Sequence, residues 1–163
     1  MHPHVVVRTA EERDIGELAA LRWVWSPPAQ PDDREALRDF TEWLADWMTA
    51  HRDDVLCKIA VADGRLIGMA WLAIYERVPN PDDRRRRTGD VQSVFVLPRF
   101  RGRGVGRRLM SELCAAADDL GIPTVTVRSS ASAMPFYERL GFTPSEFDVE
   151  RHRPAPPADR RSR

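Results

Sequence analysis

One stretch of this chain, residues 90–109, places an apolar strand, a glycine-rich turn and an amphipathic helix in direct succession. The apolar run stops at Pro98, and the turn that follows contains Gly102, Gly104 and Gly106. Glycine has no Cβ atom, so consecutive backbone N–H groups can approach a single anion closely. The first turn of the helix adds further unpaired N–H groups and the positive end of its dipole. The stretch therefore predicts a strand, a phosphate-binding loop and a helix.

The spacing of this loop excludes two common nucleotide-binding motifs. A Walker loop needs a lysine directly after its last glycine, and the only lysine of the chain, Lys58, is far from the loop in sequence. A dinucleotide fingerprint needs a third glycine three residues after Gly104, where this chain has Arg107. Positive charge around the loop is nevertheless high, because it carries Arg99, Arg101, Arg103, Arg107 and Arg108.

The loop matches another pattern, Gln/Arg-x-x-Gly-x-Gly/Ala, over residues 101–106, and Val96-Leu97-Pro98 precedes it. This closely resembles the acyl-coenzyme A loop of the GNAT superfamily of N-acyltransferases. A second segment, residues 130–142, is similar to the family's Asn-x-x-Ala-x-x-Phe-Tyr-Glu-x-x-Gly-Phe signature, with Ser130 in place of the asparagine. The two segments occur in the family's order, so the pair is a much stronger signal than the loop alone.

The resemblance implies an α/β fold of the α+β kind. Its sheet would be mixed and mostly antiparallel, with a splayed parallel pair of strands joined by the helix after the loop, and with about four flanking helices. The local patterns agree with this fold. Strands are expected at residues 5–8, 56–62, 65–75, 91–96 and 124–127, and helices at about 10–25, 34–51, 105–120 and 133–140.

Four local details follow from these patterns. Asp63-Gly64 indicates a tight hairpin between two apolar runs. Alternation in the second run places Ile67 on one face with Met69 and Trp71. Thr9 is expected to cap the first helix within a capping box. Phe142 and residues 147–150 could add one or two terminal strands.

Length and composition favour one domain over residues 1–150, followed by a tail over residues 151–163 whose proline and arginine content predicts disorder. Equal numbers of basic and acidic side chains, 25 of each, argue against nucleic acid as a partner. The zero net charge favours a small partner, and the chain shows no membrane-span pattern and no signal-peptide layout, which favours the cytoplasm. A homodimer is left open. Cys57 and Cys114 are expected as buried free thiols, and no spacing suggests a metal site.

The resemblance also implies which residues would bind acetyl-CoA. Main-chain groups of Val94, Phe95 and Val96 would lie unpaired in the sheet and receive the pantetheine arm. A main-chain N–H of this strand would polarise the thioester carbonyl. Ser130 would bond the pantetheine amides, or it would only cap a helix. The pyrophosphate would be held by the loop residues Arg101, Gly102, Arg103, Gly104, Val105, Gly106 and Arg107.

By the same resemblance, the chain would transfer an acetyl group directly from acetyl-CoA to a primary amine. Tyr137 stands where the family often has the acid that protonates the thiolate, although this tyrosine could also only pack a helix. The base is left open between Glu76, Asp90 and water. The alternative reading is a non-catalytic acyl-CoA sensor.

Two further groups of residues have open roles. The five tryptophans could line an acceptor pocket, which the family builds from its first two helices, or they could form core; they are Trp23, Trp25, Trp43, Trp47 and Trp71. An exposed loop is expected over residues 78–89. Its four arginines, residues 84–87, could engage an acidic acceptor or RNA, but a solvated loop is the simpler expectation.

Overall fold

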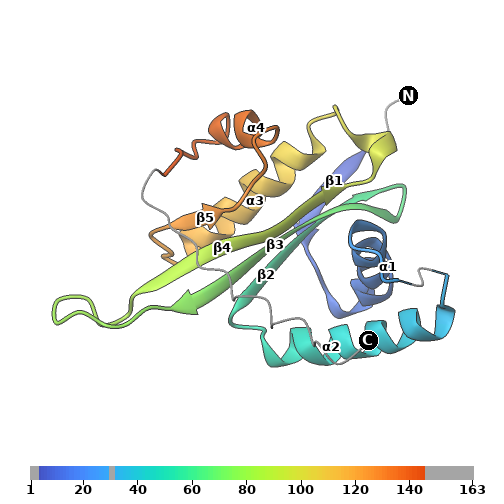
Figure 1. Cartoon of the computed structure of the whole chain (residues 1–163), viewed down its shortest axis with the longest axis horizontal. Helices are drawn as coiled ribbons and strands as arrows, with labels where there is room; N and C mark the ends of the chain where they lie inside the picture. The colour runs from blue at the N-terminus through green and yellow to red at the C-terminus, as the bar shows by residue number, and fades with distance from the viewer. Residues whose placement is uncertain (1–3, 30–31, 146–163) are drawn as a thin grey trace, which may run out of the picture.

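One five-stranded sheet organises the computed structural model, which describes residues 4–29 and 32–145 (Figure 1). The strands lie in sequence order across the sheet: β1 (Val5–Thr9), β2 (Val55–Ala62), β3 (Arg65–Glu76), β4 (Arg87–Val96) and β5 (Val125–Val127). Neighbouring strands from β1 to β4 are antiparallel, whereas β4 and β5 are parallel. The mixed, mostly antiparallel sheet expected from the sequence is confirmed.

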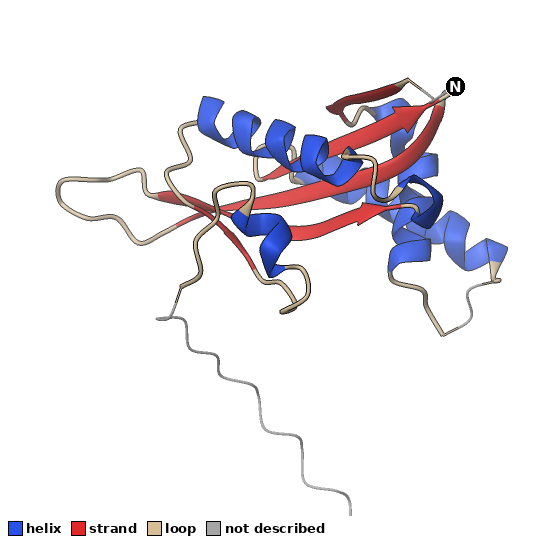
Figure 2. Cartoon of the chain, turned by 90° about the horizontal axis from the view of Figure 1, so that it is seen from above, coloured by secondary structure: helices blue, strands red, loops and turns tan. Residues whose placement is uncertain are grey.

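Helices cover both faces of this sheet (Figures 1 and 2). The four α-helices are α1 (Ile15–Trp25), α2 (Arg34–Ala50), α3 (Val105–Asp119) and α4 (Met134–Glu138), and two short 3₁₀ turns are η1 (Glu12–Asp14) and η2 (Pro98–Phe100). α1 and α2 pack on one face around a core that includes Leu18, Leu44 and Ile59. α3 packs on the other face through Leu109 and Leu113. The fold is therefore a three-layer arrangement with the sheet in the middle.

A β-bulge changes which side chains of β3 share a face. The register between β2 and β3 shifts between Ala60 and Val61, which leaves Ile67 as an extra residue on β3. An extra residue reverses the alternation of side chains. Ile67 therefore packs in the core under α3, whereas Met69 and Trp71 pack under α1 and α2. The predicted common face was wrong at Ile67, because strict alternation cannot anticipate a bulge.

The parallel strands β4 and β5 pair over only a short length. Residues Gly89 to Val91 of β4 face residues 125–127 of β5. A second bulge follows at Gln92, since Leu72 pairs with Val91 and Trp71 already pairs with Ser93. In the described part of the chain, no strand lies beside β4 on this edge after Val91. The splayed pair of strands is confirmed, and it leaves one edge of β4 open.

β4 also begins earlier than the sequence suggested. Residues 87–89 were expected in an exposed loop, but they pair with the end of β3. The Arg87 guanidinium donates to the Leu120 carbonyl at 2.6 Å, and the Thr88 hydroxyl donates to the Thr124 carbonyl at 3.1 Å. These contacts join β4 to the segment after α3, which local composition could not reveal. Only residues 77–86 form the loop.

Several smaller expectations had other outcomes. Thr9 ends β1 and does not cap α1; the Asp14 carboxylate instead accepts from the Glu11 N–H at 2.8 Å. Cys57 is buried, but Cys114 is only half-buried. Phe142 lies in no strand. Residues 147–150 and the tail over residues 151–163 lie outside the described residues, so the domain limits stay a prediction.

The Arg8–Asp14 ion pair gives a stability prediction. Arg8 donates to both carboxylate oxygens of Asp14, at 2.6 and 2.8 Å, and Asp14 is only 6% exposed. The hydrogen bond from Arg8 lowers the pKa of Asp14. Asp14→Asn should therefore reduce the free energy of unfolding by about 2 kcal/mol at pH 7.

Denaturant unfolding at several pH values tests this prediction. A carboxyl with a lowered folded-state pKa stabilises fully above its unfolded pKa, and this contribution is lost as the pH falls through the folded value. The gap between wild type and variant should be complete above about pH 5 and shrink below about pH 4. Glu12→Gln, at an exposed position two residues away, is the matched control and should change little. A pH-independent gap would contradict the ionic contribution.

Candidate active site

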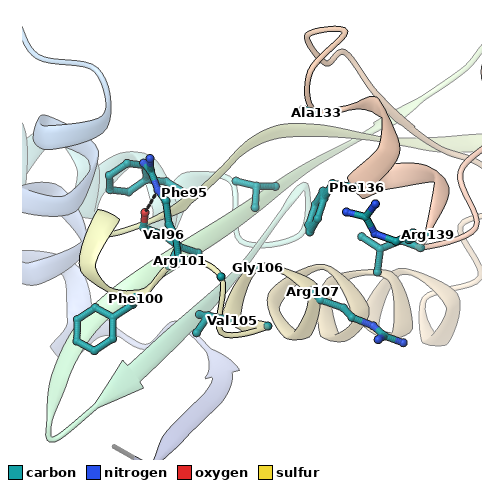
Figure 3. Close-up of a pocket in the computed structure, with 14 residues that line it drawn as sticks. Phe95, Val96, Phe100, Arg101, Val105, Gly106, Arg107, Ala133, Phe136 and Arg139 are labelled. Atoms are coloured by element: carbon teal, nitrogen blue, oxygen red, sulfur yellow. Dashed lines mark hydrogen bonds between the residues drawn. The ribbon is translucent and has the colours of Figure 1, made fainter. Parts of the chain in front are cut away.

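A cavity of about 780 Å³ lies where the open edge of β4, the glycine loop and α4 meet (Figure 3). Most residues predicted to bind the coenzyme line it: Val94, Phe95, Val96, Arg101, Gly102, Gly104, Val105, Gly106 and Arg107. Arg103 and Ser130 do not line it, and the Ser130 hydroxyl instead pairs with that of Ser132 at 3.0 Å. The structure thus gathers two segments of the chain around one hollow.

Beside this cavity, the main-chain N–H and C=O groups of successive β4 residues point alternately toward β3 and toward the open edge of the sheet. The Leu97 N–H donates to the Ile67 carbonyl of β3 at 2.9 Å. In an antiparallel ladder the hydrogen-bonding groups of every second residue point the same way, so those of Phe95 also face β3. Those of Val94 and Val96 point to the open edge. The sequence analysis expected unpaired main-chain groups at Val94, Phe95 and Val96. Only those of Val94 and Val96 lie unpaired at the open edge of the sheet, because those of Phe95 face β3.

Arg101 satisfies part of this open edge. Its Nε donates to the Val96 carbonyl at 2.9 Å, and its guanidinium carbon lies 5.6 Å from the centre of the Phe95 ring (Figure 3). The side chain is otherwise exposed. An unpaired strand edge needs a hydrogen-bonding partner, and here a side chain from the loop supplies one. Arg101 therefore occupies the edge that a strand-like ligand would pair with.

Two of the three loop glycines adopt a left-handed backbone conformation, which the sequence analysis did not predict. Gly102 and Gly104 have φ values of 72° and 76°, and a Cβ atom at either would meet no atom within 4 Å. Their requirement for glycine is thus one of backbone conformation and not of crowding. Gly104 caps α3 without a side-chain hydrogen bond, so the N–H groups of residues 105–107 have no acceptor within the helix. Three donors are therefore available beside the cavity.

The arginines of this region have different surroundings. Arg107 from α3 and Arg139 from the end of α4 both line the cavity, and neither forms an ion pair in the described part of the chain. Arg108 donates to the Val5 carbonyl at 2.8 Å and so joins α3 to β1. Arg103 lies over the Phe100 ring at 5.9 Å. Of the three arginines that line the cavity, Arg107 and Arg139 form no side-chain hydrogen bond or ion pair in the described part of the chain, and Arg101 uses only its Nε.

Sequence reasoning missed several residues of the cavity. Phe100, Ala133, Phe136, Arg139 and Leu140 line it as well. Figure 3 shows Phe136 and Arg139 reaching from the α4 segment toward the cavity. Ala133 and Phe136 stand at defined positions of the second signature, which was a usable signal. Arg139 stands at a variable position of that signature, so nothing local pointed to it.

Tyr137 adjoins this cavity without lining it. The residue is 8% exposed, and its ring packs edge-on against Phe136 and Phe142 with centroid distances of 5.0 and 5.7 Å. Burial raises the pKa of the Tyr137 hydroxyl, so it keeps its proton at neutral pH. In the described part of the chain, no fully buried side-chain oxygen lacks a partner, and no residue there bonds the Tyr137 hydroxyl. The ring is therefore packed while its oxygen still reaches solvent.

The candidate bases lie at different distances from the open edge. Asp90 stands where β4 still pairs with β5, and its carboxylate accepts from Gln92 at 2.5 Å and from Thr126 at 3.3 Å. Glu76 is exposed and pairs with Arg87 at the far end of the sheet. Asp90 precedes Val94 by four residues, roughly 13 Å along a strand. The Asp90 carboxylate is therefore too far away to contact a group bound at Val94 directly, and only a chain of waters could connect them.

The tryptophans divide between core and surface. Trp71 is 4% exposed and belongs to the core under α1 and α2. On α2, Trp43 stacks with Trp47 at a centroid distance of 6.3 Å, yet Trp43 is 59% exposed. Trp25 at the end of α1 is also exposed. Packing accounts for Trp71 and for part of Trp47, whereas Trp25 and Trp43 face solvent on the side of α1 and α2.

The sequence of this chain matches the model of a known protein family. The model of the Acetyltransferase (GNAT) family covers residues 17–142, which include both the glycine loop and the α4 segment. The chain belongs to this family. Within the part of this GNAT domain that the structure describes, no helix is long and apolar enough to cross a membrane, and no group of histidine, cysteine or acidic side chains could hold a metal ion.

Two curated relatives of this GNAT chain are named acetyltransferases, and each matches part of the chain. Glucosamine 6-phosphate N-acetyltransferase of Trypanosoma brucei brucei is 36% identical over 83 residues, which cover 51% of this chain and 54% of that protein. Mycothiol acetyltransferase of Thermomonospora curvata is 36% identical over 101 residues, covering 60% of this chain and 31% of that protein. The matched stretch thus spans about half of the first relative and less of the second.

Solved GNAT structures share the whole fold. A Trypanosoma brucei acetyltransferase has a TM-score of 0.71 and 27% identity, covering 91% of this chain and 99% of that one. An acetyltransferase of Clostridium acetobutylicum, crystallised with acetyl-CoA, has a TM-score of 0.70 and 19% identity, covering 91% and 96%. The second likeness shows the fold alone.

The left-handed glycine before α3 gives a prediction for ligand binding. Gly104→Ala should cost about 1–2 kcal/mol of stability, because a residue with a Cβ atom is strained at this φ. It should also weaken coenzyme A binding about tenfold, since relief of that strain moves the free N–H groups. Calorimetric titration with coenzyme A and denaturant unfolding measure the two effects.

Gly121→Ala is the matched control. Gly121 follows the other end of α3, has a φ of 68° and has equally open surroundings. It should lose similar stability while keeping the affinity for coenzyme A. Equal losses of affinity in both variants would refute a specific role for the loop.

Proposed function

We propose that this chain is an acetyl-CoA-dependent N-acetyltransferase that moves the acetyl group directly to a primary amine. The observation that carries the proposal is the meeting of three features in one cavity: the open edge of β4, the free N–H groups at the start of α3, and unpaired arginines. Membership of the GNAT family supports acetyl transfer as the reaction. The acceptor amine could belong to a small molecule or to a protein.

Acetyl-CoA fits the donor set of this cavity. Its pyrophosphate needs several hydrogen-bond donors and positive charge, which the N–H groups of residues 105–107 and the side chain of Arg107 offer. Its pantetheine amides need a strand-like partner, which Val94 and Val96 offer along the open edge. Arg139 supplies a second cation on the opposite wall. Binding of pantetheine there would displace Arg101 from the Val96 carbonyl.

The residues around this site can then assist transfer. When bound, acetyl-CoA supplies a thioester whose carbonyl carbon accepts the amine. The N–H of Val94 points to the open edge and can donate to the carbonyl oxygen as negative charge develops there. The protonated phenol of Tyr137 can give its proton to the departing thiolate. Neither role requires a covalent bond to the protein.

Deprotonation of the amine is assigned to water in contact with Asp90. This carboxylate lies at the last paired residues of β4 and β5, directly before the strands part. Its separation from Val94 requires a chain of waters between the carboxylate and the amine. Glu76 lies farther away, at the opposite end of the hairpin.

A screen of amines with acetyl-CoA tests the proposed function. Release of coenzyme A thiol should depend on the added amine, and mass spectrometry should show the acetylated product. Tight binding of acetyl-CoA with no turnover for any amine would favour the sensor reading instead. The cytoplasmic location and the homodimer stay predictions from the sequence. Binding of pantetheine by Ser130, and of an acidic acceptor or RNA by residues 84–87, also stay predictions.

Replacement of Tyr137 by phenylalanine tests the acid. Tyr137→Phe should lower kcat about a hundredfold and leave the dissociation constant for coenzyme A within about twofold, because the packed ring is kept and the hydroxyl is lost. Since burial raises the pKa of Tyr137, wild-type kcat should show no loss from its ionisation until the pH exceeds about 10. Tyr75→Phe, at the half-exposed far end of β3, is the control. Unchanged kcat in Tyr137→Phe would remove this tyrosine from the reaction.

Replacement of Asp90 tests the water-mediated base. Asp90→Asn should lower kcat/KM about tenfold near neutral pH and weaken its rise with pH, because the proton acceptor is lost. Glu76→Gln on the same hairpin should leave both unchanged. Parallel pH profiles of the three proteins provide the measurement, and identical profiles would assign deprotonation to bulk solvent.

A further inference from the structure

Arg22 of α1 is a half-buried cation beside the open part of β4. Its Nη1 donates to the Ser93 hydroxyl oxygen at 2.9 Å, and Ser93 is only 6% exposed. The guanidinium carbon lies 4.9 Å from the centre of the Trp25 ring and 5.7 Å from that of Trp71. Arg22 is therefore held at a fixed place between two indoles and a strand.

Among the described residues, no acidic side chain forms an ion pair with this guanidinium. The ion pairs among residues 4–29 and 32–145 involve Arg8, Arg13 and Arg38, but not Arg22. Ser93 takes one of the five N–H donors that an arginine has. Burial lowers the pKa of Arg22, which shows that its surroundings disfavour the charge. The cation–π contacts with Trp25 and Trp71 offset part of this cost.

Arg22 lies beside Ser93, which precedes Val94, the residue of β4 where transfer is proposed to occur. The bulge at Gln92 turns Ser93 toward α1, whereas Val94, the next residue, packs on the α3 side. The same stretch of β4 has no β5 neighbour, so the sheet is open at its edge there. The coenzyme cavity lies along this edge, and Arg22 lies on the other face of the sheet. A substrate that reaches Val94 from the side of α1 would pass Arg22.

We propose that Arg22 binds an oxyanion of the acceptor, so that the preferred acceptors are amines that also carry a carboxylate or a phosphate. The proposal rests on the proposed acetyltransferase function and names its substrate class. A guanidinium pairs with either oxyanion through two parallel N–H donors, and four of its donors are unused by Ser93. Trp25, which is 39% exposed, gives the site an open apolar wall.

A purely structural role makes a different prediction. If Arg22 only ties α1 to β4, its loss should weaken all acceptors alike and lower stability. If it binds an oxyanion, its loss should weaken anionic acceptors selectively. Selectivity between matched amines therefore separates the two roles, whatever the change in stability.

The experiment compares two pairs of amines, each with and without the oxyanion. The pairs are phenylalanine with phenylalaninamide, and phosphoethanolamine with ethanolamine. For wild type, Arg22→Gln and Arg22→Lys, steady-state kinetics give kcat and KM with acetyl-CoA, and calorimetry gives the affinity of each amine for the coenzyme A complex. Arg38→Gln on α2, whose arginine is exposed and pairs with Glu35, is the charge-matched control.

Wild type should prefer the anionic member of at least one pair. Arg22→Gln should raise KM and the dissociation constant for that member about tenfold to a hundredfold, with less than threefold change for the neutral member and in coenzyme A affinity. Arg22→Lys should recover part of the preference, since the charge is kept and the two-pronged geometry is lost. The favoured pair shows whether the oxyanion is carboxylate or phosphate.

Other outcomes separate this inference from the proposed function. Acetylation of neutral amines with no anionic preference, or a preference that Arg22→Gln leaves unchanged, would overturn the oxyanion site while the acetyltransferase proposal stands. Arg22-dependent binding of the anionic amines without any acetylation would support the site and overturn the transferase. Equal loss for both members of each pair would assign Arg22 to a structural role.

Discussion

The parting of β4 from β5 is the constraint on which the rest of the site depends. The strands pair only over residues 89–91 and 125–127, and the edge of β4 beyond Val91 has no strand beside it in the described part of the chain. Open N–H and C=O groups at a sheet edge must be satisfied by water, a side chain or a ligand. Arg101 does this for Val96. The cavity is thus a consequence of an incomplete sheet, closed by the loop and by α4.

A bulge allows one strand to serve both faces of the sheet. At Gln92 the alternation of β4 reverses, so that Ser93 meets Arg22 on the side of α1 while Val94 packs on the side of α3. Without the extra residue, Ser93 would point toward α3. The coenzyme loop and the proposed oxyanion site can therefore lie on opposite faces and still address the same short segment of main chain.

Local charge, and not net charge, distinguishes this protein. The formal charge is zero, and Arg8 is neutralised by a buried carboxylate. Arg22, Arg107 and Arg139 have no acidic partner in the described part of the chain, and each lies beside a surface where a ligand could bind. Arg22 is half-buried, so its unpaired charge is costly and a bound anion would stabilise it, whereas Arg107 and Arg139 are exposed and already solvated. A net charge of zero therefore gives no indication of these local unpaired cations.

The sequence by itself determined the strand, the glycine loop and the helix, together with the parallel pairing of β4 and β5, because backbone conformation at Gly102 and Gly104 and a short crossover helix are local properties. It also indicated the lining of the cavity from the loop. Only the tertiary structure decided the two bulges, the place of Arg139 and the contact between Arg22 and Ser93. That last contact joins residues 71 positions apart. Such features depend on how distant segments pack against one another, and no local pattern of residues encodes that packing.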